Sequence, residues 1–379
     1  MLHRRSAAAA IGLAAALPWG ARATETAAAA RELLLGHTGV LSGALGVPIR
    51  ALLAGAGLAF QQVNAGGGLF GRRIRLESLD DALQPDQAVA NYKTLLNERQ
   101  VLAMFGCVGS GTTAAAGPLL QDSGAPLVGA YAVADSARRK VAGSAYFVRA
   151  GTGREAQAIV QHLHTLGVER IAAAHLDNPG GQEAASLLQQ ALAERKLQLV
   201  QTVAVQGDGG NAGAAGAALA KQGPQAVVMY LAGDLPAKLM QGHWGAGGNA
   251  LFYGMSIVNG EVVARALGEG MRSGLTIAQV MPYPWSRLEP SARQFRSLAE
   301  AANVPVGYLS FEGYANALVM VEALRRCGPE PSRARLHAAL RGLKQTIAGL
   351  DIDFSNREAI AGSRLVDMVH IGKEGRFVR

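Results

Sequence analysis

The residues best suited to chemistry lie where a predicted strand runs through small side chains into a predicted helix. This stretch, residues 105–113, reads FGCVGSGTT. Small side chains let a ligand approach the backbone, and the free N–H groups at a helix N-terminus attract an anion. Gly109, Ser110, Gly111 and Thr112 are therefore candidates for holding a carboxylate. A plain capping role for Ser110 or Thr112 fits the local sequence equally well.

Two further groups of polar residues follow predicted strands in the second half of the chain. Asp177 and Asn178 come after the apolar run 170–175, and Asp234 follows the run that ends at Leu231. In open α/β sheets, ligands collect at the carboxyl ends of the strands. These three residues are therefore candidates for a ligand site on a second sheet.

Catalytic and metal-binding motifs are missing from the sequence. It contains no GxSxG, HExxH or CxxC. His162 and His164 stand two apart on a predicted helix and point to different faces, which is poor geometry for a shared metal ion. The sequence thus favours a binding protein over an enzyme, with no cofactor and no metal. A hydrolase or lyase that uses Asp177 or Asp234 is the remote alternative.

The elements that must position these residues alternate between strands and helices. Residues 33–81 predict a β-α-β unit, with Pro48 at the helix start and a buried stripe along the helix. The stripe consists of Ile49, Leu52, Leu53, Ala56, Phe60 and Val63. Helices at 85–99 and 112–123 and strands at 102–106 and 125–130 continue the alternation, which restarts after residues 146–149. This pattern predicts an α/β protein with two doubly wound parallel sheets.

The N-terminus has the features of an export signal. Arg4 and Arg5 precede an apolar run at 7–19, and Ala21-Arg22-Ala23 fits a signal-peptidase site. The run is shorter than the ~20 residues that span a membrane. We therefore expect signal cleavage near Ala23, a periplasmic location and no membrane insertion. The formal net charge of +8 comes from scattered basic residues without interleaved aromatics, which favours a solvated surface over nucleic-acid binding.

Several motifs together resemble one family. The order of TGVLSG (38–43), VNAGGGLFGRRI (63–74), DD (80–81) and YLSFEGY (308–314) resembles type I periplasmic solute-binding proteins of the leucine/isoleucine/valine-binding family. The resemblance covers nearly all of the chain after residue 23. It implies two lobes on a three-strand hinge, with crossings near Arg149, Val280 and Ala348. Residues 24–148 plus 281–347 would form lobe 1, and residues 149–280 plus 348–379 would form lobe 2.

The same resemblance assigns roles in a cleft between the lobes. Ser110 aligns with the serine that holds the ligand carboxylate. The alanine, threonine and acid that complete the grip on an α-amino acid fall at Tyr131, Val133 and about Ser256, so none matches. A buried ammonium without a partner is costly. Asp234 is the candidate to replace that acid, and Tyr131 would suit an aromatic or apolar ligand unless it is a plain core residue.

Gly180 is a further departure, because family members often carry an aromatic residue there. This departure predicts a larger cleft or looser closure.

These observations predict the extracytoplasmic solute-binding component of an ABC importer. It would capture a branched-chain or other apolar amino acid, or a related aromatic or aliphatic carboxylate, and pass it to membrane permease subunits while acting as a monomer. The alternative is a ligand-sensing module of the same fold that reports a solute to a signalling partner. The sequence does not separate these two roles.

Overall fold

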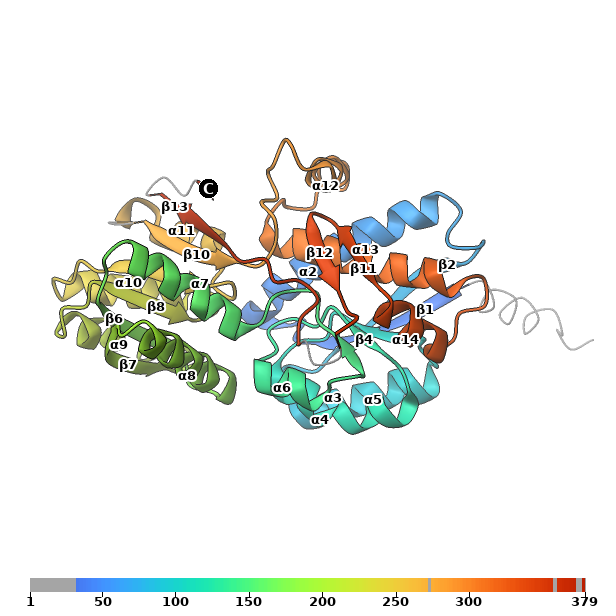
Figure 1. The fold of residues 1–379 in the computed structure, drawn as a ribbon, viewed down its shortest axis with the longest axis horizontal. Helices are drawn as coiled ribbons and strands as arrows, with labels where there is room; N and C mark the ends of the chain where they lie inside the picture. The colour runs from blue at the N-terminus through green and yellow to red at the C-terminus, as the bar shows by residue number, and fades with distance from the viewer. Residues whose placement is uncertain (1–31, 272–273, 357–359, 373–376, 379) are drawn as a thin grey trace, which may run out of the picture.

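The protein consists of two α/β lobes that lie side by side (Figure 1). The computed structural model describes residues 32–271, 274–356, 360–372 and 377–378. The predicted export signal and its cleavage site near Ala23 lie outside the described residues.

The first lobe is built on a five-stranded sheet of order β2-β1-β3-β4-β5, in which all neighbouring strands are parallel. Its strands are β1 (Glu32–Gly39), β2 (Arg73–Asp80), β3 (Ala103–Phe105), β4 (Leu127–Val128) and β5 (Ala145–Tyr146). One face packs against α2 (Gly43–Ala65) and α13 (Tyr308–Cys327), and the other against α3 (Pro85–Lys93), the π-helical turn Thr94–Glu98 and α5 (Gly117–Ser123). The lobe also contains α4 (Ser110–Ala115), α6 (Asp135–Lys140), α12 (Pro290–Ala301), α14 (Arg333–Arg341) and the hairpin β11 (Lys344–Ile347)–β12 (Leu350–Asp353).

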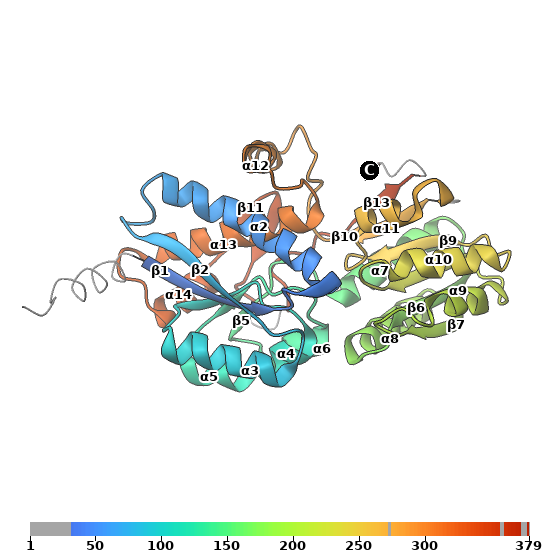
Figure 2. The same cartoon turned by 180° about the vertical axis from the view of Figure 1, so that it is seen from behind.

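The second lobe is built on a seven-stranded sheet of order β14-β13-β10-β9-β8-β6-β7. Its strands are β6 (Arg170–Leu176), β7 (Gln198–Val205), β8 (Ala226–Tyr230), β9 (Leu251–Met255), β10 (Leu275–Gln279), β13 (Asp367–Ile371) and β14 (Phe377–Val378). The first five are parallel, and β13 and β14 are antiparallel additions. Helices α7 (Thr152–Thr165) and α8 (Pro179–Glu194) lie on one face of the sheet. Helices α9 (Ala212–Ala220), α10 (Leu235–Gly245) and α11 (Gly260–Leu267) lie on the other face (Figure 2). A 3-10 turn, Gly268–Gly270, follows α11. The predicted α/β class with parallel sheets is confirmed.

Two predicted helices differ in detail from the structure. Helix α2 begins at Gly43, about a turn before Pro48, because extended Ser42 starts it and accepts a hydrogen bond from the Gly46 N–H. The helix predicted at 112–123 is two helices, α4 and α5, which meet at Ala116. Pro118 lies in the first turn of α5, where a missing N–H leaves no hydrogen bond broken.

Three connections link the lobes, and they suggest where the lobes begin and end. The chain passes from β5 to α7 through residues 147–151 and from β10 to α12 through residues 280–289. It passes from β12 to β13 between residues 354 and 366, of which 354–356 and 360–366 belong to the described residues. Near Ala348 the chain is still within the first lobe, because Leu350, Ile352 and Phe354 bury their side chains in the same core cluster as α13 and α14. It pairs with the second sheet from Asp367 onward. We propose lobe boundaries that follow these connections, with the third crossing after Phe354.

His37, near the end of β1, predicts a pH dependence of stability. Its side chain is completely buried, its Nδ1 lies 3.1 Å from the Phe105 carbonyl oxygen, and its Nε2 has no partner among the described residues. Burial lowers the pKa of His37 to about 4. In the unfolded chain His37 binds a proton near pH 6.5, whereas in the folded chain it stays neutral until about pH 4. The free energy of unfolding therefore falls as the pH drops from 6.5 towards 4, by about 3 kcal/mol in all.

A His37→Asn variant keeps a side-chain N–H but cannot titrate. We expect the difference in unfolding free energy between wild type and variant to shrink as the pH falls from 7 to 4.5, as measured by urea titration. His164→Asn, at an exposed position on α7, serves as the control and is expected to change this pH dependence little. A parallel pH dependence for wild type and His37→Asn would contradict the prediction.

Candidate functional site

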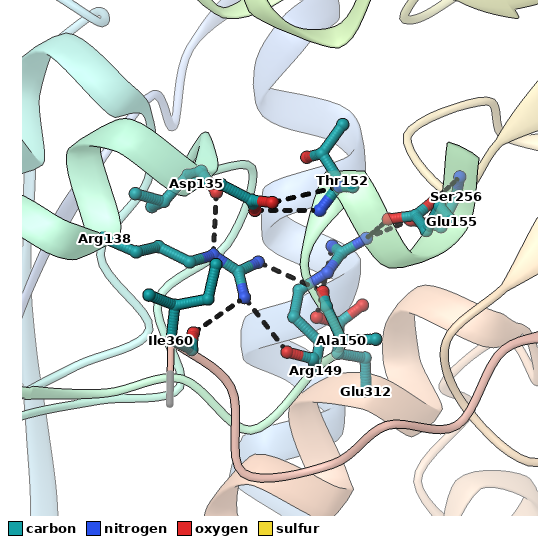
Figure 3. Close-up of polar contacts among 11 residues, drawn as sticks. Asp135, Arg138, Arg149, Ala150, Thr152, Glu155, Ser256, Glu312 and Ile360 are labelled. Atoms are coloured by element: carbon teal, nitrogen blue, oxygen red, sulfur yellow. Dashed lines mark hydrogen bonds and ion pairs between the residues drawn. The ribbon is translucent and has the colours of Figure 1, made fainter. Parts of the chain in front are cut away.

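Arg149 lies at the centre of the region where the two lobes meet. It follows β5 on the first connection, and its guanidinium reaches side chains of both lobes (Figure 3). Its Nη1 lies 3.4 Å from Glu312 Oε1 of α13, and its Nη2 lies 3.6 Å from Glu155 Oε1 of α7. Nη2 also donates a hydrogen bond to Ser256 Oγ, after β9. The guanidinium carbon stands 5.0 Å from the centre of the Tyr131 ring, which is a cation–π contact.

This cluster combines the Arg149 guanidinium with two carboxyl groups, and all three side chains are buried. Arg149, Glu155 and Glu312 are each at most 5% exposed. Burial raises the pKa of both carboxyl groups, against the lowering effect of Arg149. Burial disfavours the Arg149 charge, yet Glu312 and Glu155 raise the pKa of the guanidinium above its usual range. The Arg138 guanidinium also lowers the pKa of both carboxyl groups, while Arg149 is the cation that contacts them directly.

The carboxyl groups of Glu155 and Glu312 differ in their hydrogen-bond partners. Glu155 Oε2 also accepts a hydrogen bond of 2.6 Å from the Ser256 backbone N–H. Among the described residues, Arg149 is the one hydrogen-bonding partner of Glu312, at 3.4 Å. Charge-assisted hydrogen bonds are ordinarily near 2.7–2.9 Å, so this contact is a long one. Glu312 thus has capacity for a second cationic or hydrogen-bonding partner.

A second pair of charges, in α6, braces the connection that carries Arg149. The Arg138 guanidinium donates to the carbonyls of Val133, Arg149, Ala150 and Ile360 at 2.9–3.2 Å. The Asp135 carboxylate accepts from the backbone N–H groups of Thr152 and Gly153 at 2.9 and 3.0 Å, at the start of α7. Burial, together with the nearby Arg149 charge, lowers the pKa of Arg138 to about 10. Helix α6 therefore fixes the first and third connections to the first lobe.

The predicted carboxylate-binding stretch lies at the carboxyl end of β3. Gly109 has φ +96, which favours glycine, and its N–H donates to the Tyr131 carbonyl at 3.0 Å. Ser110 Oγ accepts from the Ala134 N–H at 2.9 Å and donates to the Ala132 carbonyl at 3.4 Å. The Thr112 hydroxyl bonds back to the carbonyls of Val108 and Gly109, and Gly111 is exposed. The two hydroxyl groups thus support the loop that presents Tyr131.

The second lobe brings the start of α8 against this stretch. Asn178 Oδ1 caps α8 by accepting from the Gly181 N–H at 2.8 Å, whereas Asp177 is exposed at the end of β6. A Cβ built on Gly180 would stand 3.5 Å from Ser110 Oγ. This distance is an ordinary van der Waals contact, so the start of α8 lies against Ser110. The expectation of a larger cleft or looser closure stays a prediction.

The structure separates two of the predicted site residues from the rest. The Val133 side chain is buried in the first-lobe core with Ala130, Ala137 and Phe147. Asp234 precedes α10, is 54% exposed and pairs with Lys238 Nζ at 3.0 Å, one turn further along that helix. Ser110, Tyr131 and Ser256 lie around the centre of the interface together with Gly180.

Our sequence analysis did not include Arg149, Glu155 or Glu312 among the candidate site residues. Arg149 and Glu312 lie in runs of apolar or small neighbours, whereas Glu155 follows Arg154. That was the available signal, because charges are seldom buried without a partner.

The described part of the chain contains no helix with the length and apolar character needed to cross a membrane. It also contains no group of three or more His, Cys, Asp or Glu side chains placed to hold a metal ion.

The comparison with known families decides the identity. The model of the family described as periplasmic binding protein matches residues 32–375. The chain belongs to this family. This result confirms the predicted resemblance to type I periplasmic binding proteins. The family consists of substrate-binding proteins, so the protein is a binding protein and not an enzyme, as predicted.

Solved structures of periplasmic binding proteins agree closely in fold. A substrate-binding periplasmic protein from Ralstonia solanacearum superposes with a TM-score of 0.84 at 27% identity, over 92% of this chain and 99% of that one. A possible leucine/isoleucine/valine-binding protein from Rhodopirellula baltica SH 1 gives a TM-score of 0.81 at 25% identity, over 93% and 97% of the two chains.

A curated protein, the amino acid binding protein of Pseudomonas aeruginosa, is 36% identical over 70 residues. That match spans 18% of this chain and 19% of the relative's length.

Proposed function

We propose that this periplasmic binding protein is the solute-capturing component of an ABC importer and works as a monomer in the periplasm. It would take up a small organic solute between its lobes and present the closed form to membrane permease subunits. The observation that carries the proposal is the position of Arg149. This residue lies on a connection between the lobes and contacts Tyr131 and Glu312 of one lobe and Glu155 and Ser256 of the other. A solute at this point would bias the equilibrium between open and closed forms.

The charge of the cluster favours an amino acid as the solute. A protonated amine beside Glu312 would neutralise the carboxylate that Arg149 alone does not balance. The aromatic ring of Tyr131 offers an apolar surface next to it. The carboxylate of the solute would approach the backbone at residues 109–112. Two similar proteins support this class: the Pseudomonas aeruginosa protein is named an amino acid binding protein, and the Rhodopirellula baltica protein a possible leucine/isoleucine/valine-binding protein.

A thermal-shift screen tests the proposed function. The protein is stripped of bound solute by unfolding and refolding, then heated with apolar amino acids, aromatic and aliphatic carboxylates, amides or polyamines. A solute at ~100 times its dissociation constant stabilises the folded state by about 2.7 kcal/mol, which is a readily measured shift. We expect shifts with apolar amino acids and a much smaller response to acids that lack the amine.

The double variant Ser110→Ala/Tyr131→Ala probes the same site. We expect it to bind the responding amino acid at least tenfold more weakly by calorimetry, a loss of ~1.4 kcal/mol. An unchanged dissociation constant would place the solute elsewhere. If no compound of the screen shifted the melting temperature of the wild-type protein, the proposed solute classes would be wrong.

A further inference from the structure

A pair of hydrogen bonds joins the lobes away from the central cluster. Helix α6 of the first lobe faces the start of α8 of the second lobe in both ribbon views (Figures 1 and 2). The Ser136 backbone N–H donates to Glu183 Oε1 at 2.7 Å, and the Ser136 hydroxyl donates to Glu183 Oε2. One carboxylate thus binds two donors of a single residue, 47 positions away in the sequence.

This pair differs in position from the contacts that brace the hinge. Asp135, the neighbour of Ser136, binds the backbone of Thr152 and Gly153 where the connection enters α7. Contacts on the connection itself can persist while the lobes rotate. Glu183 belongs to the body of the second lobe, on the same helix as Gly180, which approaches Ser110 closely. Rotation of the lobes away from each other would therefore break the Ser136–Glu183 pair.

We propose that Glu183 is an affinity-determining residue that touches no solute. Its carboxylate holds the closed form by binding both donors of Ser136, and so it slows solute release. This inference rests on the proposed function, because it requires closure around a solute. The two hydrogen bonds are charge-assisted, and the carboxylate binds both donors of one residue at an exposed position.

Rate constants of binding test the role of Glu183. We would measure association and dissociation by stopped flow with L-leucine, L-phenylalanine and benzoate as probes, in wild type, Glu183→Ala and Ser136→Ala. The pair forms only after the lobes close, so Glu183→Ala is expected to speed dissociation about tenfold and to leave association within about twofold. Ser136→Ala keeps the backbone N–H and is expected to have a smaller effect.

Glu194→Gln is the matched control. Glu194 lies on the same helix about three turns further on, at an exposed position. We expect wild-type rate constants for this variant and wild-type melting temperatures for all variants without solute. A merely structural role for Glu183 would instead lower the melting temperature without a selective effect on dissociation.

A distance measurement gives a second readout of closure. Spin labels at Lys140→Cys and Gln190→Cys, on exposed positions of α6 and α8, report the separation of the lobes by pulsed EPR, since Cys107 and Cys327 are buried. At a subsaturating concentration of solute, the Glu183→Ala variant is expected to show the longer distance between the two spin labels more often than wild type does. Unchanged dissociation in Glu183→Ala, or an equal change in Glu194→Gln, would overturn the inference. If wild type bound none of the three probes, that result alone would refute the proposed function for these solutes, and the inference with it.

Discussion

Replacement of Arg149 by methionine is expected to lower the free energy of unfolding by about 3–5 kcal/mol at pH 7.5. The substitution leaves the Glu155 and Glu312 carboxylates buried without their shared cation. Methionine fills a similar volume, so the loss reports charge rather than a cavity. Urea titration followed by tryptophan fluorescence measures the change.

The pH dependence of the Arg149→Met variant distinguishes charge from packing. Burial already raises the pKa of Glu155 and Glu312 above the unfolded value, and loss of Arg149 would raise it further. A carboxyl group with a raised folded-state pKa destabilises the fold above that pKa, and the penalty disappears as the pH falls through it. We therefore expect the difference in unfolding free energy between wild type and variant to shrink as the pH is lowered from 7.5.

Two comparisons complete this experiment. The triple variant Arg149→Met/Glu155→Gln/Glu312→Leu removes all three charges and is expected to recover most of the lost stability. Arg154→Met, at an exposed position on α7, is expected to change stability by less than about 0.5 kcal/mol. A loss below 1 kcal/mol in Arg149→Met, or one independent of pH, would show that the cluster does not bury its charges as described.

Glu312→Gln is expected to remove the preference of the protein for solutes that carry an amine. We expect wild type to bind L-phenylalanine about 100-fold more tightly than 3-phenylpropanoate, which lacks only the amino group. In Glu312→Gln the carboxylate that would pair with the ammonium is neutral, so the ratio is expected to approach one. Calorimetric titration of both compounds into both proteins measures this ratio.

Glu322 provides the control for this prediction. It lies on the same helix, α13, and forms ion pairs with Arg325 and Arg326. Glu322→Gln is expected to keep the wild-type preference. A wild-type protein that bound 3-phenylpropanoate as tightly as L-phenylalanine would refute the role of Glu312, because the site would then show no preference for an amine.

Local sequence patterns anticipated most of the fold. In α2, Ile49, Leu52, Ala56 and Phe60 are buried as their helical spacing predicts. The break between α4 and α5 was missed, although Gly117 and Pro118 mark it. Near Ala348, the hairpin β11–β12 remains with the first lobe because Leu350 and Ile352 complete a core whose other members come from α13 and α14. A short hairpin does not reveal from its own residues which lobe it covers.

The composition and periodicity of the sequence by themselves determined the two parallel sheets and the helices on their faces, because a strand or helix depends on neighbours within a few positions. The order of short motifs along the chain indicated the family, which the family model confirms. Only the tertiary structure decided which charges meet. Arg149 and Glu312 are 163 positions apart, and Ser136 and Glu183 are 47 apart on different lobes. The first pair forms only when distant segments of the chain fold against each other, and the second only when the two lobes meet, so spacing along the sequence does not reveal either pair. Val133 and Asp234, which we predicted as site residues, lie apart from the cluster around Arg149, and Arg149 and Glu155 were not among the predicted residues.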